Sequence, residues 1–341
     1  MSGDPAAAVP GPITAWAVTT GEAGMRSQAR GLARAVADAV VEKTVRVAAP
    51  WRWAPPALVA RPLSRLDRRA DALAPPWPDL MVTCGRRSAA LGLAVRRESG
   101  GRTVAVHIQD PRLPVADFDL VVALDHDDMP GAANVIATAT AMHDVTPAAL
   151  ATAAEAWRIR LGVLGRPLAG VMIGGSTRRR PFGAREADKL IAGLRRLRES
   201  GAALAISPSR RTPGPVLSRL AAAFAGDGRV WLWDRAGDNP YLGILALADR
   251  LVITGDSVSM VSEAVATASP VEVFDPDSER HERFLDALVA RGRVRRFEGD
   301  PAPPPVPEPL DATLAVAAVV RRLLRERRTV QESTGVVGKA S

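Results

Sequence analysis

The sequence predicts an α/β protein of two domains, each built around a parallel sheet. Its 341 residues suit two domains of ordinary size. Short, nearly all-apolar runs alternate with helical segments of 10–15 residues, a pattern typical of βαβ units whose sheet is buried on both faces. The alternation stops around residues 145–167 and starts again at residue 169, which predicts a second doubly wound half.

The first predicted domain covers residues 13–150 and follows a flexible N-terminus at 1–12, which lacks the pattern of a secretory signal. The expected strands are 13–20, 45–50, 79–85, 103–109 and 119–124. The expected helices are 29–43 and 86–99. Residues 51–78 are broken by prolines and predict a loop with one short helix.

The second predicted domain covers residues 151–300. Its first residue lies within a helix expected at 146–164. The expected strands are 169–176, 203–209, 229–234, 250–256 and 270–275. The expected helices are 184–200, 216–226, 241–249, 258–268 and 280–292. A Pro-rich connector and a helix at 312–328 make up residues 301–328, and 329–341 is expected to be a disordered tail.

Composition excludes several classes of protein. Hydrophobic residues make up 47% of the chain, but no apolar run reaches the roughly 18 residues that cross a bilayer. The single cysteine, Cys84, allows neither a disulfide framework nor a thiolate metal cluster, so a cytoplasmic protein is expected. The net charge of +8 comes mainly from arginine in an alanine-rich chain, a bias typical of genomic base composition. Because no aromatic stripe accompanies the arginines, nucleic acid is not favoured as a partner.

Ligands of open parallel sheets bind at the carboxyl ends of the strands, where helix N-termini converge. At one such end, Gly174, Gly175, Ser176 and Thr177 are followed by Arg178. Glycines allow a ligand to approach the backbone, and the hydroxyls can donate to phosphate oxygens. The alternative is a tight turn with solvated arginines.

A second loop and a third add to this set. Ser209, Arg210 and Arg211 follow a predicted strand, and two neighbouring guanidiniums suit a diphosphate. An ordinary polar turn is the alternative. Asn239, in the loop before another predicted helix, could form the wall of a base pocket, although the proline after it is also a common first residue of a helix.

The segment VITGDSVSMVSEA (252–264) is the most informative of these strand ends. Asp256, Ser257 and Ser259 can each cap the helix that follows. Glu263 can accept hydrogen bonds from the vicinal hydroxyls of a ribose. Since a carboxylate repels phosphate, Asp256 is expected to cap the helix or to hold a sugar hydroxyl.

These segments resemble the mitochondrial-fission protein family, which is named for its plant members and is widespread in bacteria. The matching segments are CGRRSA (84–89), HIQDPR (107–112), AMHDVTP (141–147), IGGSTRR (173–179), SRRTPG (209–214), GDNPYLGILALAD (237–249) and TGDSVSMVSEA (254–264). The family is similar to GT-B glycosyltransferases, which implies two Rossmann-like domains facing a cleft.

Within GT-B enzymes, the chain is similar to the N-acetylglucosaminyltransferase that makes the lipid-linked peptidoglycan precursor. The resemblance aligns Gly174–Ser176 with the Gly-Gly-Ser turn that opens the C-terminal domain of that enzyme. It implies that Glu263 is the ribose ligand. It also implies that helix 312–328 packs on the first domain.

The chain departs from that enzyme in the first domain. The enzyme's first strand-end loop carries a histidine, whereas residues 21–28 here contain none. Glu22, Asp110 and His126 are the candidates for the base that activates the acceptor, and the sequence does not choose among them. His107 is expected to be a buried, satisfied core residue.

The predicted function is a metal-independent GT-B-like glycosyltransferase that uses a nucleoside diphosphate sugar and acts on a cell-envelope or other small acceptor. The alternative is a non-catalytic adaptor that binds a protein partner at a membrane, as the resemblance to the fission family implies. Trp51, Trp53 and Trp77 with the basic helix 312–328 could contact the inner face of an anionic membrane, unless they are simply packed and solvated.

Overall fold

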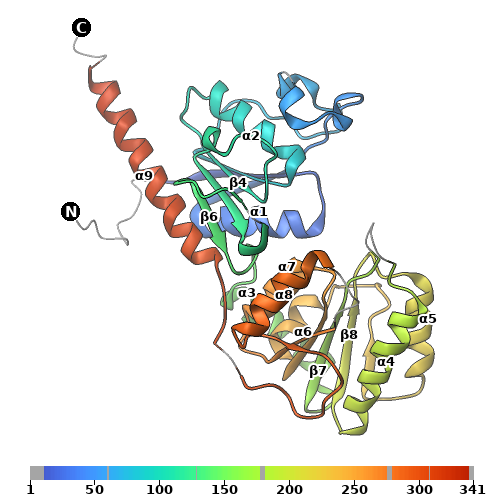
Figure 1. The fold of residues 1–341 in the computed structure, drawn as a ribbon. Helices are drawn as coiled ribbons and strands as arrows, with labels where there is room; N and C mark the ends of the chain where they lie inside the picture. The colour runs from blue at the N-terminus through green and yellow to red at the C-terminus, as the bar shows by residue number, and fades with distance from the viewer. Residues whose placement is uncertain are drawn as a thin grey trace. The chain divides into compact units, whose positions relative to one another are not determined.

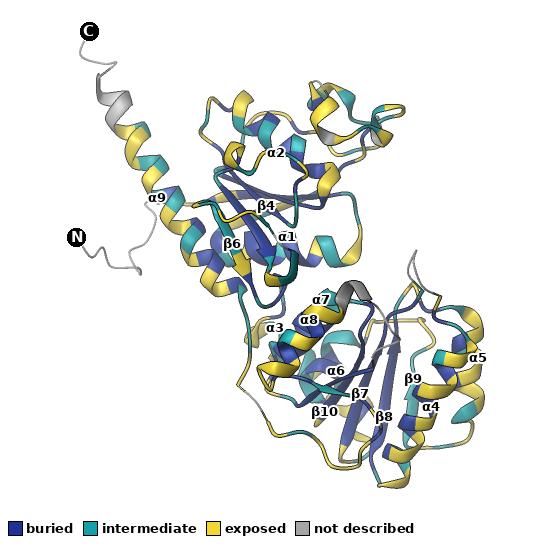
Figure 2. Cartoon of the chain, in the orientation of Figure 1, coloured by how far each residue is buried: buried dark blue, intermediate teal, exposed yellow. Residues whose placement is uncertain are grey.

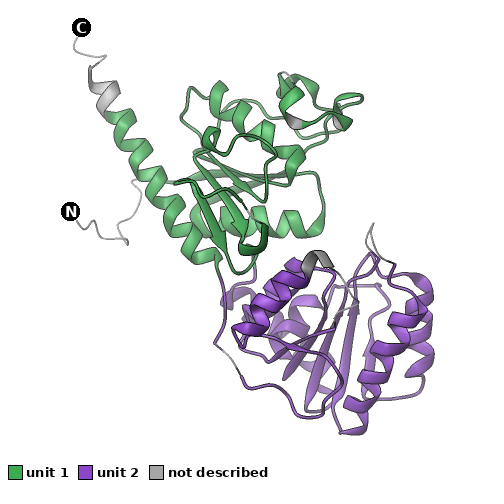
Figure 3. Ribbon diagram, viewed as in Figure 1, with its two compact units in different colours: residues 1–144, 312–341 green, residues 145–311 purple. Residues whose placement is uncertain are grey.

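A computed structural model of the protein describes residues 11–59, 61–127, 129–176, 181–274, 279–306 and 308–337. The chain divides into two compact units (Figure 3). Unit 1 consists of residues 1–144 and 312–341, and unit 2 of residues 145–311. Figure 1 labels the helices and strands of both units.

Unit 1 contains a six-stranded parallel sheet in the order β2-β1-β3-β4-β5-β6. The strands are β1 (Thr14–Thr19), β2 (Ala39–Thr44), β3 (Leu80–Cys84), β4 (Val104–Ile108), β5 (Leu120–Leu124) and β6 (Val135–Thr138). Every residue of β3 and β4 is buried, as expected for central strands covered on both faces (Figure 2). The last strand, β6, was not predicted.

The beginning of this sheet differs from the prediction of a helix over residues 29–43. The first helix ends at Val36, and the edge strand β2 occupies Ala39–Thr44. The turn between them is held by the Asp38 carboxylate, which accepts a hydrogen bond from the amide of Ile13 at 2.7 Å. This contact joins the turn to the start of β1, so tertiary structure overrides the helical pattern here.

Three α-helices cover the sheet of unit 1. They are α1 (Ala23–Val36), α2 (Arg86–Glu98) and α9 (Thr313–Val337). Short 3-10 turns lie at 51–53, 56–58, 62–65, 115–117 and 125–127. Helix α9 packs on α1 and the sheet through Val316, Val320 and Leu324, as the resemblance implied. It continues to Val337, beyond its predicted end at residue 328 and into the predicted tail.

Unit 2 contains a second six-stranded parallel sheet, in the order β12-β11-β10-β7-β8-β9. Its strands are β7 (Leu168–Ile173), β8 (Ala203–Pro208), β9 (Val230–Leu232), β10 (Arg250–Thr254), β11 (Val271–Phe274) and β12 (Arg295–Arg296). Its helices are α3 (Pro147–Gly162), α4 (Ala184–Glu199), α5 (Gly214–Ala223), α6 (Tyr241–Leu247), α7 (Val258–Val265) and α8 (Glu279–Ala290). Unit 2 begins at Val145 and not at the predicted residue 151, so α3 lies wholly within it.

Apolar layers on both faces of β7, β8 and β10 hold unit 2 together (Figure 2). Helices α3 and α6 pack closely because Gly243 leaves room for the ring of Trp157, which a β-carbon at that position would strike. At the amino ends of the strands, the buried carboxylate of Glu272 accepts hydrogen bonds from Arg250 Nε at 2.9 Å and Arg295 Nη2 at 2.7 Å.

Candidate functional site

The strand order of unit 2 creates a topological switch point between β7 and β10. From β7 the chain adds β8 and β9 on one side, then returns to add β10 on the other. At such a point the two connections leave in opposite directions, and ligands of open α/β sheets bind beside it. Gly174 follows β7 directly and Asp256 follows β10 by one residue, so both lie at this point.

Asp256 joins the loops that follow three neighbouring strands. Its carboxylate is buried and accepts hydrogen bonds from the Gly175 amide at 3.0 Å and the Thr254 hydroxyl at 2.6 Å. It also forms an ion pair with Arg211 Nη2 at 2.7 Å. Thr254 in turn accepts a hydrogen bond from the Gly174 amide at 2.7 Å. The loops after β7, β8 and β10 are therefore fixed to one carboxylate.

This arrangement explains why glycines occupy positions 174 and 175. A β-carbon at Gly174 would overlap the Asp256 carboxylate, and one at Gly175 would overlap the backbone carbonyl of Arg211. The sequence predicted that the glycines open the backbone to a ligand. Their amides donate to Thr254 and Asp256, so within the protein they bring the three loops together, and their role toward a ligand stays a prediction.

The loop after β8 is fixed by its own side chains. The Ser209 hydroxyl donates to the Gly174 carbonyl at 2.7 Å, and the Thr212 hydroxyl donates to the same carbonyl at 2.5 Å. Arg235 Nη2 donates to the Ser209 and Thr212 carbonyls, both at 2.7 Å. The Arg210 side chain is exposed on this fixed loop.

Arg211 has two roles in the same loop. Its side chain is 44% exposed, and one terminal nitrogen contacts Asp256 while the other donates to the Gly175 carbonyl at 3.4 Å. A guanidinium carries five N–H donors in a planar fork, so these contacts leave donors for an anion. Together with Arg210 it gives the loop two exposed cations in sequence.

Helix α7 carries the other predicted residues. Ser257 is its N-cap, and the hydroxyl accepts a hydrogen bond from the Met260 amide at 3.4 Å. Asp256 does not cap this helix, because its carboxylate is used by Gly175, Thr254 and Arg211. Ser259 lies in the first turn of α7.

Glu263 lies in the second turn of α7 and is buried, with 7% of its surface exposed. Its carboxylate accepts a hydrogen bond from the hydroxyl of Tyr241, the only tyrosine of the chain. The Tyr241 amide donates to Asn239 Oδ1 at 3.0 Å. The predicted residues Asn239 and Glu263 are thus joined through Tyr241.

The turn after β7 is described only in part. The Ser176 hydroxyl accepts a hydrogen bond from the Phe182 amide at 3.0 Å, which joins the two ends of the loop between β7 and α4. Thr177 and Arg178, predicted to contact phosphate, lie outside the described residues. Their roles stay predictions.

The three candidate bases of unit 1 each contact a residue close in sequence. The Thr20 hydroxyl donates to Glu22 at 2.5 Å. Asp110 accepts a hydrogen bond from the Arg112 amide at 2.8 Å and forms an ion pair with its Nε at 2.8 Å. His126 Nε2 lies 3.7 Å from Asp127 Oδ1. None of these described bonds joins one candidate base to another.

Two other polar residues of this sheet are buried. His107 lies within β4, where Nδ1 is 2.8 Å from the Thr83 hydroxyl, and burial lowers the pKa of its imidazole to about 3. The predicted burial of His107 is confirmed, but the prediction that it is satisfied is wrong for Nε2, which has no hydrogen-bond partner among the described residues. Burial and, to a smaller extent, the charge of Glu22 raise the pKa of the Cys84 thiol. A neutral buried thiol is a poor nucleophile, so Cys84 is a core residue.

The three tryptophans of the proline-broken segment 51–78 differ in exposure and packing. Trp53 is 66% exposed, whereas Trp51 lies under Arg65, with the guanidinium 4.7 Å from its ring centre. Trp77 packs edge-on against Trp16, with ring centres 6.0 Å apart. Within the described ranges, no helix combines the length and the apolar character that crossing a bilayer requires.

Two Rossmann-like parallel sheets, the second with polar loops at its switch point, place the chain in the GT-B class of folds. Two similar solved structures are a Staphylococcus aureus protein, MnaA, determined with UDP, and a UDP-GlcNAc 2-epimerase of Neisseria meningitidis bound to UDP-GlcNAc. Each is 14% identical with a TM-score of 0.51 and covers 92% of this chain; the match covers 90% of the first and 100% of the second.

The chain belongs to the mitochondrial fission ELM1 family, whose model matches residues 23–324. Mitochondrial fission protein ELM1 of Arabidopsis thaliana is 31% identical over 277 residues, which are 73% of this chain and 65% of that protein. An uncharacterized protein of Rickettsia prowazekii is 26% identical over 257 residues, covering 64% of this chain and 72% of its own length. The chain thus spans somewhat less than two thirds of its Arabidopsis relative.

Proposed function

We propose that the chain binds a nucleoside diphosphate sugar at the carboxyl edge of β7, β8 and β10, and that it is a glycosyltransferase. The observation that carries the proposal is a fixed loop with two exposed guanidiniums, Arg210 and Arg211, beside the switch point. Two adjacent guanidiniums on a rigid loop suit a diphosphate, because little conformational freedom is lost when the anion binds.

Glu263 is proposed to hold the ribose. A buried carboxylate is costly unless its oxygens accept hydrogen bonds, and the hydroxyl of Tyr241 already supplies one. Two vicinal hydroxyls of a ribose can supply further ones. The two similar structures contain UDP and UDP-GlcNAc, so uridine diphosphate sugars are the first ligands to test.

In the transfer reaction, positive charge at Arg210 and Arg211 would stabilise the departing nucleoside diphosphate. A base would remove the proton of the acceptor hydroxyl as the new glycosidic bond forms. Glu22, Asp110 and His126 remain the candidates for that base. No metal or other cofactor is part of the proposal.

The second candidate function is an adaptor that binds the nucleotide sugar or a protein partner without turnover. The observation that favours it is the local bonding of all three candidate bases, each of which contacts a residue one or two positions away. Release of free UDP from a bound donor in the presence of cell-envelope acceptors distinguishes the two, since an adaptor releases none.

The binding proposal is tested by a thermal-shift screen of uridine, guanosine and adenosine diphosphate sugars, followed by titration of the best ligand. Glu263→Gln is the test variant, because its amide oxygen still accepts the hydrogen bond of Tyr241 while the charge is lost. Charged hydrogen bonds contribute about 1.5–3 kcal/mol, so affinity should fall at least about tenfold. Glu199→Gln, an exposed glutamate at the end of α4, is the matched control and should bind as the wild type does.

The proposal fails if none of the three classes of sugar nucleotide raises the melting temperature. It fails equally if Glu263→Gln binds the best ligand as tightly as Glu199→Gln does.

A further inference from the structure

Unit 1 contains a pocket that shares no lining residue with the proposed nucleotide site of unit 2. It has a volume of about 390 Å³ and lies between the C-terminal part of α9 and the proline run at 75–78. Its lining includes Trp77, Asp79, Arg102, Leu324, Arg327 and Arg328. Asp79 precedes β3 and Arg102 precedes β4, so the pocket lies at the amino ends of the strands, opposite the edge that carries Glu22 and Asp110.

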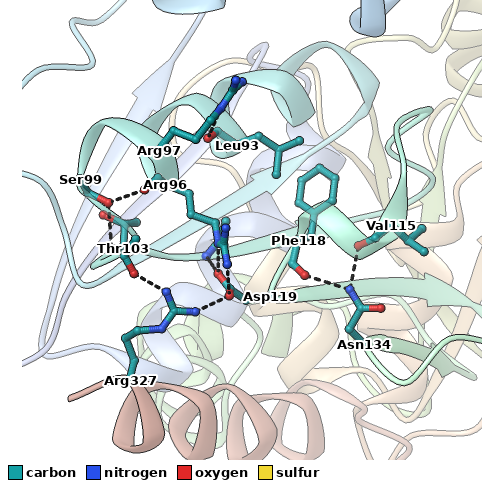
Figure 4. A network of polar contacts seen from close by, with 12 residues as sticks. Leu93, Arg96, Arg97, Ser99, Thr103, Val115, Phe118, Asp119, Asn134 and Arg327 are labelled. Carbon is teal, nitrogen blue, oxygen red and sulfur yellow. Dashed lines mark hydrogen bonds and ion pairs between the residues drawn. The ribbon is translucent and has the colours of Figure 1, made fainter. Parts of the chain in front are cut away.

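Arg327 lines this pocket, and its positive charge is only partly balanced by its ion-pair partner, Asp119. It forms an ion pair with Asp119, whose carboxylate also accepts hydrogen bonds from Arg96 Nε at 3.0 Å and from the Ala105 amide at 2.8 Å (Figure 4). Two guanidiniums therefore share a single carboxylate. Since Asp119 already receives these donors, it has little capacity to neutralise a further cation.

Asp79, the only carboxylate of the described lining, is also engaged. It accepts hydrogen bonds from the Thr14 amide at 2.8 Å and hydroxyl at 2.9 Å, and pairs with Arg328 at 3.1 Å. Burial alone would raise the pKa of Asp79, but these hydrogen bonds and the Arg328 charge outweigh it and lower the pKa. Asp79 is thus ionised at neutral pH, and its charge is matched by Arg328.

Arg102 is the cation left over. Its Nε donates to the Ser99 carbonyl at 2.9 Å, while its side chain is exposed and no carboxylate of the described chain pairs with it. The pocket is lined by three arginines, Arg102, Arg327 and Arg328, and by one carboxylate, Asp79, so positive charge is in excess. An anion bound in the pocket would balance this excess of positive charge.

Apart from Gln331, the rest of the lining is apolar. Trp77 is half-buried against Trp16, Leu324 is buried in the face of α9 that packs on the sheet, and prolines flank Trp77. Cations on one side and an aromatic, proline-rich wall on the other suit a ligand that joins a charged group to an apolar one.

We propose that this pocket binds a phosphate monoester that carries an apolar group. A phosphate monoester has up to two negative charges near neutral pH and accepts bidentate hydrogen bonds from guanidiniums. The same chemistry occurs in a soluble organic phosphate and in the headgroup of phosphatidic acid. The site belongs to unit 1 alone and is separate from the proposed nucleotide site of unit 2.

The test is a calorimetric titration of the full chain with phenyl phosphate. Arg102→Glu is the test variant, because Arg102 is exposed and its loss breaks no ion pair within the described chain. Arg97→Glu, an exposed arginine at the end of α2 outside the pocket, is the control for general charge. We expect a dissociation constant of about 1 mM or tighter, about tenfold weaker in Arg102→Glu, and unchanged within about twofold in Arg97→Glu.

The absence of binding to the wild type overturns the proposal, as does an equal loss in the two variants, which would indicate diffuse attraction to a basic surface. If Arg102→Glu fails to fold, Arg102→Gln replaces it with the same expectation of weaker binding. Sedimentation with phosphatidylcholine vesicles, with and without phosphatidic acid, then shows whether the phosphate ligand is a lipid headgroup or a soluble ester. Binding to the acidic vesicles that Arg102→Glu abolishes supports a lipid, and phenyl phosphate binding without vesicle binding supports a soluble ester.

Discussion

The candidate residues at the carboxyl ends of the two sheets differ in how far along the chain their hydrogen bonds and ion pairs reach. In unit 2, Asp256 contacts an amide 81 residues away, and Arg211 contacts a carbonyl 36 residues away. In unit 1, Glu22, Asp110 and His126 contact residues one or two positions away. Long-range contacts fix several loops as one platform, whereas local ones fix only a single turn. The comparison favours unit 2 as the place where a ligand is held.

The largest effect on stability is expected for Asp256→Ala. The variant leaves the Gly175 amide and the Thr254 hydroxyl without their buried acceptor and removes the partner of Arg211. Because Arg211 is partly exposed, most of the cost comes from the two buried donors, and we expect a loss of about 3 kcal/mol in the free energy of unfolding. Urea denaturation measures it.

Asp256→Asn is the milder companion, since its single amide oxygen still accepts one of the two hydrogen bonds, while the other and the ion pair are lost. It should be clearly more stable than Asp256→Ala. If Asp256→Ala unfolds at the same urea concentration as the wild type, the platform in unit 2 is not held by this carboxylate.

A second effect is expected from pH in unit 1. The pKa of His107 is about 3 in the folded protein and about 6.5 when unfolded, so only the unfolded chain takes up a proton between these values. Stability therefore falls as the pH drops below about 6.5, and at about pH 5 the loss from His107 is about 2 kcal/mol. Urea denaturation at about pH 8 and about pH 5 measures it, with His107→Gln as the control.

The difference between the two pH values should be smaller in His107→Gln than in the wild type, even if the variant is less stable at both. Equal differences in the two proteins would show that His107 is not the group that makes unit 1 sensitive to acid.

The smallest effect is expected for Asp110→Ala, the counterpart of Asp256→Ala in unit 1. Its ion pair with Arg112 is local and solvent-exposed, with Arg112 itself 71% exposed. Such pairs contribute little, so the free energy of unfolding should change by less than about 0.5 kcal/mol. A loss comparable to that of Asp256→Ala would remove the contrast between the two edges.

The sequence predicted much of the fold because its signals were local. Strands β7, β8 and β10 follow the apolar runs expected for a sheet covered on both faces, and the turn at Gly174 falls where it was placed. Strand β2 was instead included in a helix, since the contact of Asp38 with Ile13 that fixes it is a tertiary one.

The site was predictable by residue but not by partner. Asp256 and Glu263 were both singled out, yet no pattern within their own segment reveals that Asp256 binds Gly175 or that Tyr241 binds Glu263. The presence of a single tyrosine, at the first residue of a predicted helix, was the one available signal. Pairing across separate strands depends on sheet order, which the sequence alone did not give.

The most direct test of the account is hydrogen–deuterium exchange of the full chain with and without its best-binding nucleotide sugar. Slower exchange is expected in the segments 172–176, 207–213 and 254–264, which end at the carboxyl edge of the second sheet. Exchange in Glu263→Gln should change less at the same ligand concentration. Protection confined to the strand-end loops of unit 1, or none in either unit, would contradict the claim that unit 2 holds the ligand.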